Sequence, residues 1–193
     1  MGDPLGRARK PINGAGAEHS REAWGEPDPQ HLAVLVHGFY PDRLVELLRR
    51  LGGADPEPFR DGLDLYVSTS REQLSTVAEL LREQGWPRVR LLGVPNRGRD
   101  VAPFLLHLLP EALRTGHQLF VKVHTKRSGH LSDGESWAAH LLSSLLEPTA
   151  RLGWQALLEA DPGLGLLAPA GTVLACTVAL HTNLQHLLAL CSR

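Results

Sequence analysis

Two short loops concentrate cationic and polar side chains that could hold a phosphorylated ligand. In the first, PNRGRDVAPF, Arg97 and Arg99 could each donate paired hydrogen bonds to phosphate oxygens. Gly98 between them lets the backbone approach a ligand closely. Asn96 and Asp100 could fix the turn or bind sugar hydroxyls. An alternative stays open, in which Asp100 holds one of the arginines and caps the helix that follows.

The second loop, KVHTKRS, brings more positive charge after a short apolar run. Lys122, His124 and Lys126 alternate along the chain, so they share one face if a strand continues that far. Two ammonium groups and an imidazole on one face would neutralise a diphosphate, and the hydroxyl groups of Thr125 and Ser128 add hydrogen-bond donors. The alternative is a solvated basic loop. No tight metal-ligand spacing is present, so we expect no metal site.

The surrounding pattern predicts the elements that position these loops. The continuous apolar run that begins at Leu32 is typical of a strand buried on both faces. Strands are expected over residues 32–36, 63–70, 89–95, 117–126 and 164–169. Helices are expected between them and over residues 135–147, 151–160 and 180–190, with Asp42 and Ser70 as N-caps of the first two. This alternation predicts an α/β, Rossmann-like fold, a mostly parallel sheet with helices on both faces.

Several polar groups follow the ends of the expected strands. In parallel sheets ligands bind beyond the carboxyl ends of the strands, so these groups should converge on one edge. They are His37, residues 68–70, residues 96–100 and residues 124–128.

Composition limits the function classes further. Residues 1–30 are rich in Gly and Pro and predict a flexible tail, followed by one domain over residues 31–193. The net charge of -1 gives no global field for nucleic acid, so any anion site must be local. The only cysteines, Cys176 and Cys191, suggest a reducing, cytoplasmic compartment. No apolar run is long enough to span a bilayer, and no signal peptide is recognisable, which leaves peripheral membrane association as an expectation.

One catalytic alternative starts from the first strand. VLVHGFYPD is similar to the strand and His-Gly opening of α/β-hydrolases. That fold needs a Gly-x-Ser-x-Gly nucleophile elbow, which this chain lacks. No phosphate-binding Walker loop and no Gly-x-Gly-x-x-Gly is present either. The hydrolase hypothesis therefore has no nucleophile.

The ordered motifs HGFYPD, DLYVSTS, NRGRDVAPF, KVHTKRS, GESW and LGLLAP resemble the rhamnan synthesis protein F family over about residues 31–193. The resemblance implies a GT-A-like glycosyltransferase domain in bacterial polysaccharide assembly. Its donor would be a nucleoside-diphosphate sugar, with dTDP-L-rhamnose the first choice, and its acceptor a growing lipid-linked glycan at the inner face of the membrane. No other cofactor is implied.

The resemblance also implies which residues bind the donor. The family motif residues of this sequence are His37, Tyr40, Asn96, Arg97, Gly98, Arg99, Asp100, His124, Thr125, Lys126 and Ser128. The loop over residues 96–100 is assigned to the nucleotide and the sugar. Lys126 with His124 is assigned to the leaving diphosphate.

Two departures from the family pattern affect catalysis. Where GT-A enzymes carry a metal-binding Asp-x-Asp, this chain has His124-Thr125-Lys126, so fixed cations could replace a metal. Family members also continue beyond the last residues of this chain, which makes a truncated, fragmentary or catalytically silent domain an open alternative. Asp133 and Glu135 are then the candidate catalytic bases. A non-catalytic module that binds nucleotide-sugars is the second function hypothesis.

Overall fold

The computed structural model describes residues 20–52, 60–125 and 134–173. The chain divides into two compact units. The first contains residues 1–41 and 61–124, and the second contains residues 42–60 and 125–193.

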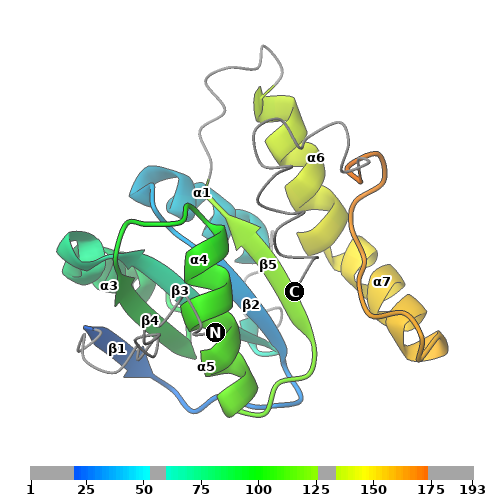
Figure 1. The fold of residues 1–193 in the computed structure, drawn as a ribbon, viewed down its shortest axis with the longest axis horizontal. Helices are drawn as coiled ribbons and strands as arrows, with labels where there is room; N and C mark the ends of the chain where they lie inside the picture. The colour runs from blue at the N-terminus through cyan, green and yellow to red at the C-terminus, as the bar shows by residue number, and fades with distance from the viewer. Residues whose placement is uncertain (1–19, 53–59, 126–133, 174–193) are drawn as a thin grey trace, which may run out of the picture. The chain divides into compact units, whose positions relative to one another are not determined.

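The first unit is built on a mixed sheet of five strands (Figure 1). They are β1 (Arg21–Trp24), β2 (Leu32–His37), β3 (Leu63–Ser70), β4 (Val89–Val94) and β5 (Phe120–His124). Their order across the sheet is β1-β4-β3-β2-β5. The pairs β2–β3, β3–β4 and β2–β5 are parallel, whereas β1 runs antiparallel to β4. The α/β class is confirmed, with a sheet that is mixed rather than entirely parallel.

The strands β2 to β5 match four of the five expected strands, and the differences fall elsewhere. Arg21–Trp24, inside the expected tail, forms the edge strand β1. This strand is fixed by side chains distant in sequence: the Trp24 indole donates to the Trp86 carbonyl at 2.8 Å, and Arg82 pairs with Glu22 at 2.5 Å. The strand expected over residues 164–169 does not form, and Leu166 there is 85% exposed. Whether a short segment forms a strand depends on the neighbouring strand with which it pairs, and the composition of the segment does not identify that neighbour.

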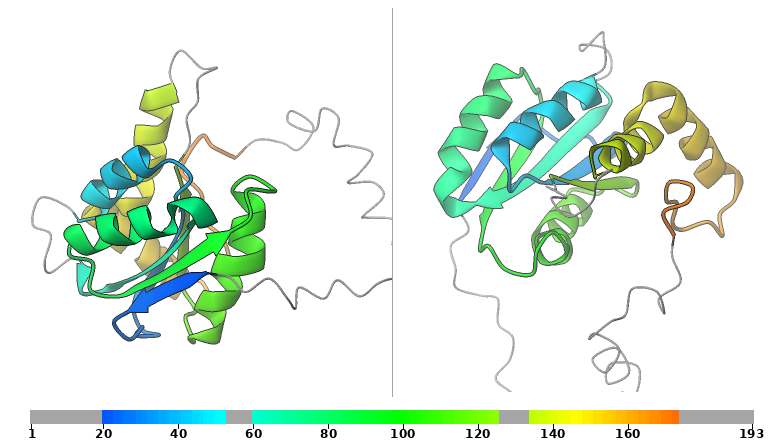
Figure 2. Two further views of the ribbon diagram at one scale, coloured as in Figure 1. Left: turned by 90° about the vertical axis from the view of Figure 1, so that its left-hand side faces the viewer. Right: turned by 90° about the horizontal axis from the view of Figure 1, so that it is seen from above.

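Helices cover both faces of this sheet (Figure 2). On one face lie a 3₁₀ turn η1 (Arg71–Gln73) and α3 (Leu74–Glu83). On the other lies one continuous helical segment made of α4 (Val101–Pro103), the π turn η2 (Phe104–Leu108) and α5 (Leu109–Arg114). The buried core beneath it consists of Ala33, Leu35, Tyr66, Leu92, Val94, Leu108 and Ala112. This segment joins β4 to β5 and therefore crosses the sheet.

The second unit contains three described helices. They are α1 (Pro41–Gly52), α6 (Gly134–Leu146) and α7 (Pro148–Ala160). The helical spacing of leucines in α1 is confirmed, because Leu44, Leu47, Leu48 and Leu51 are all buried. Asp42 lies in the first turn of α1 rather than before it, since the helix begins at Pro41. The helix expected over residues 180–190 lies outside the described residues. Among the helices the structure describes, none is long and apolar enough to cross a bilayer.

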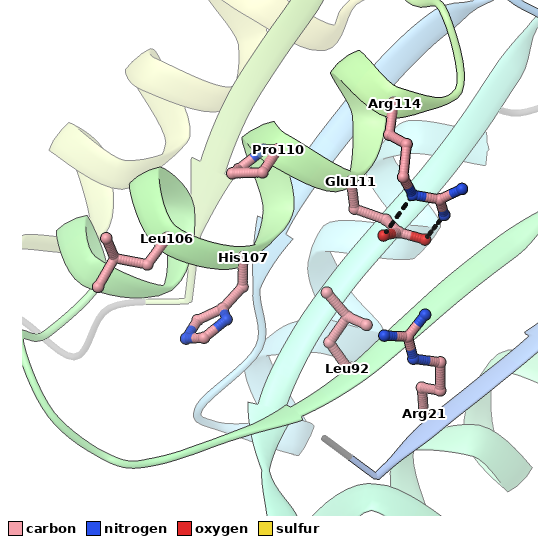
Figure 3. Close-up of a pocket in the computed structure, with 7 residues that line it drawn as sticks. All are labelled: Arg21, Leu92, Leu106, His107, Pro110, Glu111 and Arg114. Atoms are coloured by element: carbon pink, nitrogen blue, oxygen red, sulfur yellow. Dashed lines mark hydrogen bonds and ion pairs between the residues drawn. The ribbon is translucent and has the colours of Figure 1, made fainter. Parts of the chain in front are cut away.

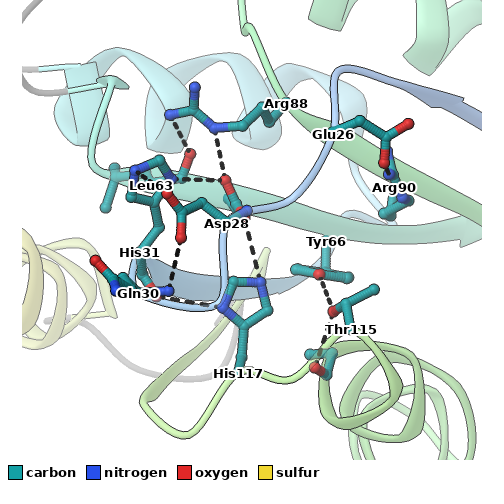
Figure 4. A network of polar contacts seen from close by, with 12 residues as sticks. Glu26, Asp28, Gln30, His31, Leu63, Tyr66, Arg88, Arg90, Thr115 and His117 are labelled. Atoms are coloured by element: carbon teal, nitrogen blue, oxygen red, sulfur yellow. Dashed lines mark hydrogen bonds and ion pairs between the residues drawn. The ribbon is translucent and has the colours of Figure 1, made fainter.

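A buried carboxylate ties together the amino-terminal edge of the sheet (Figure 4). Asp64, the second residue of β3, is 1% exposed and accepts hydrogen bonds from the Asp28 backbone N at 2.6 Å and from Arg88 Nε at 2.7 Å. His31 Nδ1 lies 3.1 Å from it. His117 Nε2 lies 3.2 Å away, close enough for an ion pair but without hydrogen-bond alignment. The Asp64 cluster therefore joins four segments at the edge opposite the polar loops.

Candidate functional site

The strand order reverses between β2 and β5. In chain order β2, β3 and β4 step across the sheet in one direction, whereas β5 lies on the other side of β2. In open α/β sheets the crevice outside the strand ends at such a reversal is where ligands bind. His37 and His124 end these two strands and are register partners. The topology thus brings together two of the residues that the sequence singled out.

His37 is held by the neighbouring strand. Its residue is 7% exposed, and its Nδ1 lies 3.0 Å from the hydroxyl of Ser68, which is fully buried. Burial lowers the pKa of His37 below 6.5, the nearby charges of His124 and Lys122 lower it further, and Asp100 opposes them. The imidazole is therefore neutral near pH 7 and fixed in orientation.

The chain that leaves β2 is anchored at this edge and carries two aromatic rings. The Gly38 N–H donates to the Ser68 carbonyl at 2.8 Å, and the Thr69 hydroxyl donates to the Gly38 carbonyl at 3.1 Å. The half-buried rings of Phe39 and Tyr40 pack edge to face, with centroids 4.9 Å apart. These contacts place aromatic surface beside His37.

Asp100 links the loop after β4 to strand β5. Its Oδ2 accepts a hydrogen bond from Lys122 Nζ at 2.5 Å and lies 3.6 Å from His124 Nδ1. Burial raises the pKa of Asp100, but the hydrogen bond from Lys122 and the charges of His124 and Lys122 outweigh it and keep the pKa below its usual value. The loop is therefore salt-bridged, but to Lys122 rather than to an arginine, and the carboxylate makes no helix-capping hydrogen bond.

The two arginines of this loop remain exposed. Within residues 20–52, 60–125 and 134–173, the side chains of Arg97 and Arg99 make no hydrogen bond or ion pair. Gly98 has φ 74°, and a Cβ there would lie 2.3 Å from the Ala102 Cβ. Arg99 has φ 54°, a conformation that is uncommon for a non-glycine residue and is found preferentially at functional sites. The turn therefore presents two unneutralised guanidinium groups at the cost of local strain.

The structure brings only part of the expected site together. His37, Asp100, His124 and Lys122 form one cluster, which we call the switch-point cluster, and Lys122 and His124 share a sheet face as expected. Asn96 is exposed in the same loop as the arginines, and Thr125 is buried directly after β5.

The remaining candidates are not tested by these contacts. Lys126, Ser128 and Asp133 lie outside the described residues, and Glu135 lies in the first turn of α6. One contribution was missed from sequence: Phe39 follows His37 and Gly38 directly, and its ring centroid is 6.3 Å from that of His37. An aromatic pair immediately after a buried strand is the signal that could have found it.

The burial of His37 predicts a pH dependence of stability. Because the folded-state pKa of His37 is below 6.5, the ordinary value of a histidine, the unfolded chain binds more protons than the folded chain between the two values. The contribution is therefore complete above pH 6.5 and is lost as the pH falls through the folded-state pKa. We expect His37→Gln to reduce the loss of stability between about pH 7 and pH 5, measured by urea unfolding at each pH. If His37→Gln lost as much stability between these pH values as the unchanged chain, the burial of a neutral imidazole would be contradicted.

The chain matches a protein-family model and two curated relatives. Residues 17–187 match the family model described as Rhamnan synthesis protein F. The chain is similar to the "Uncharacterized protein WxcX" of Xanthomonas campestris pv. campestris strain B100, with 31% identity over 154 residues. The same identity and length hold for WxcX of a second strain. These alignments cover 80% of this chain but 21% of each relative, so the chain spans about a fifth of their length.

No solved structure matches the chain significantly. The family match extends over most of the sequence, including every strand of the sheet. This chain belongs to the rhamnan synthesis protein F family.

Proposed function

We propose that the edge of the sheet between β2 and β5 binds a nucleoside-diphosphate sugar, and that the domain transfers the sugar during the synthesis of a surface polysaccharide. The family name supports a role in polysaccharide synthesis. The activity and the GT-A type of the fold are our inference. One observation carries the proposal: two unneutralised arginines stand on a strained turn that is joined by Asp100 to the topological reversal of the sheet.

The arginine turn would bind the diphosphate. Guanidinium groups present planar, paired donors that match phosphate oxygens, and Arg97 and Arg99 have no competing acceptor among the described residues. Gly98 adds a stretch of backbone that a phosphate can approach closely. Lys126 and Ser128 are proposed to contact the same diphosphate from the end of β5.

The switch-point cluster would hold the sugar and its neighbouring groups. His37 is neutral, so it can donate or accept one hydrogen bond to a hydroxyl, and the rings of Phe39 and Tyr40 offer an apolar surface beside it. Asn96 and Thr125 are proposed as further polar contacts. His124 Nδ1 lies 3.6 Å from Asp100 Oδ2, so the carboxylate links this imidazole to the cluster.

Transfer requires the departing diphosphate to be stabilised and the acceptor hydroxyl to lose a proton. Positive charges that are already fixed in place can stabilise a developing negative charge without having to reorient during the reaction. We propose that Arg97, Arg99 and Lys126 do this for the diphosphate in place of a metal. Asp133 and Glu135 remain the proposed bases for the acceptor.

Thermal unfolding in the presence of nucleotides tests the donor class. A ligand that binds only the folded state at a hundred times its dissociation constant adds about 2.7 kcal/mol to stability. We expect dTDP to raise the melting temperature more than UDP or GDP, and to do so equally with and without EDTA. If no nucleoside diphosphate shifts the transition, the domain does not bind this donor class. If EDTA removes the shift, binding depends on a metal.

Binding without transfer is a second candidate. Of the carboxylates the structure describes, Asp100 alone belongs to the switch-point cluster, and it is already paired with Lys122. A domain with no available base would bind the donor and leave it intact. Stabilisation by dTDP-L-rhamnose without release of dTDP in the presence of an acceptor glycan would favour this function.

A further inference from the structure

The helical segment from Val101 to Arg114 is apolar on both sides. Its inner side packs on the sheet through Leu108 and Ala112. Four large apolar side chains, which we call the outer face, are each more than half exposed: Val101 54%, Leu105 51%, Leu106 67% and Leu113 54%. A helix that is apolar all round is normally covered on both sides. The outer face therefore indicates a surface that something else covers.

The widened turn η2 contributes to this exposure. Leu105 and Leu106 both lie within this π turn and are both exposed. An α-helix turns by about 100° per residue, so consecutive residues normally differ in burial. π turns inside α-helices are rare and are found frequently at functional sites.

A cationic pocket adjoins the outer face (Figure 3). It has a volume of about 230 Å³, and Leu106, the most exposed of the four, is part of its wall. Arg21 from β1 and Arg114 from α5 supply its positive groups, and Arg114 is paired with Glu111. In the described parts of the chain the side chain of Arg21 makes no hydrogen bond or ion pair. None of the pocket residues belongs to the switch-point cluster.

The charge beside the outer face is positive. The acidic group in the pocket wall, Glu111, is already paired with Arg114. Arg21 lies beside Leu106 in the pocket wall and, among the described residues, has no acidic partner. The whole chain carries a net charge of -1, so this positive charge is a local feature.

We propose that the outer face docks on an anionic lipid bilayer, with its leucines at the boundary between headgroups and acyl chains and with Arg21 at the headgroup phosphates. Exposed leucines bordered by arginines are the pattern of helices that lie in the plane of a membrane surface. This proposal is independent of the nucleotide site.

Vesicle co-sedimentation of the full chain tests it. Vesicles of phosphatidylglycerol and phosphatidylcholine in equal parts should bind the chain, whereas pure phosphatidylcholine should bind it weakly. Leu105→Glu with Leu106→Glu should lower the partition coefficient about tenfold or more, since it removes two apolar side chains from the interface. Arg21→Gln should lower it about fivefold on the anionic vesicles, the effect of one basic residue near such a surface.

A matched control lies on α7. Leu152 and Leu157 are 66% and 56% exposed, so Leu152→Glu with Leu157→Glu changes charge and exposed apolar surface to a similar degree. This variant should bind the anionic vesicles as the unchanged chain does. Circular dichroism should show that both double variants are folded.

Three results would overturn the proposal. They are equal binding to both kinds of vesicle, retained binding by the Leu105 and Leu106 variant, and equal loss in the α7 control. Light scattering of the free chain gives a further decisive outcome. If it shows a dimer that the Leu105 and Leu106 substitutions dissociate, the outer face is an interface between two copies and not a lipid-binding surface.

Discussion

Replacing Asp64 with alanine is expected to lower the free energy of unfolding by about 3–5 kcal/mol, the usual cost of removing one partner from a buried ion pair. The carboxylate is buried, and it neutralises Arg88 at 2.7 Å while it faces His31 and His117. Without it, the Nε–H of Arg88 and the Asp28 N–H lose their acceptor. Urea unfolding followed by tryptophan fluorescence measures the change.

Asp61 provides the control for this substitution. It is exposed, and its contact with Arg88 is through the backbone carbonyl, which alanine retains. Asp61→Ala should therefore change stability by no more than about 0.5 kcal/mol. Equal effects of the two substitutions would show that the Asp64 cluster does not hold the edge of the sheet together.

Replacing Arg97 and Arg99 together with alanine is expected to raise the dissociation constant for dTDP about a hundredfold or more, because each hydrogen bond to a charged group contributes about 1.5–3 kcal/mol. Both side chains are exposed and make no contact in the described residues, so stability should change little. Isothermal titration calorimetry measures the affinity, and thermal unfolding without ligand checks the fold.

The adjacent arginines of α1 provide a matched double substitution. Arg49 and Arg50 pair with Glu46 on the exposed side of the helix, where ion pairs contribute little. Arg49→Ala with Arg50→Ala should leave dTDP affinity unchanged. An equal loss in both double variants would mean that the effect comes from net charge rather than from the turn after β4.

Much of the fold follows from local pattern. The run from Leu32 and the stretches at 63–70 and 89–95 form buried strands, and short segments rich in aliphatic and β-branched residues are typical of strands buried on both faces. The position of the arginine turn was also predictable. It comes directly after a strand, and in such sheets ligands bind beyond the carboxyl ends of the strands. These features depend on residues close together in the sequence.

Features that depend on distant partners were not predictable in the same way. The edge strand β1 exists through contacts of Trp24 and Glu22 with residues about 60 positions away. The partner of Asp100 could not be predicted from the sequence. Asp100 pairs with Lys122, which lies on β5, beyond the helical segment that crosses the sheet. The Asp64 cluster was not expected at all, although an aspartate inside an apolar strand is a signal of a buried ion pair.

The location of bound nucleotide is the most direct test of the proposed site. Amide NMR of the isotopically labelled chain, titrated with dTDP, reports which residues sense the ligand. Binding between β2 and β5 predicts saturable shifts at Gly38, Arg99 and His124, and little change at Arg21 and Arg114 in the cationic pocket. Shifts confined to that pocket, or no saturable shifts at any residue, would contradict it.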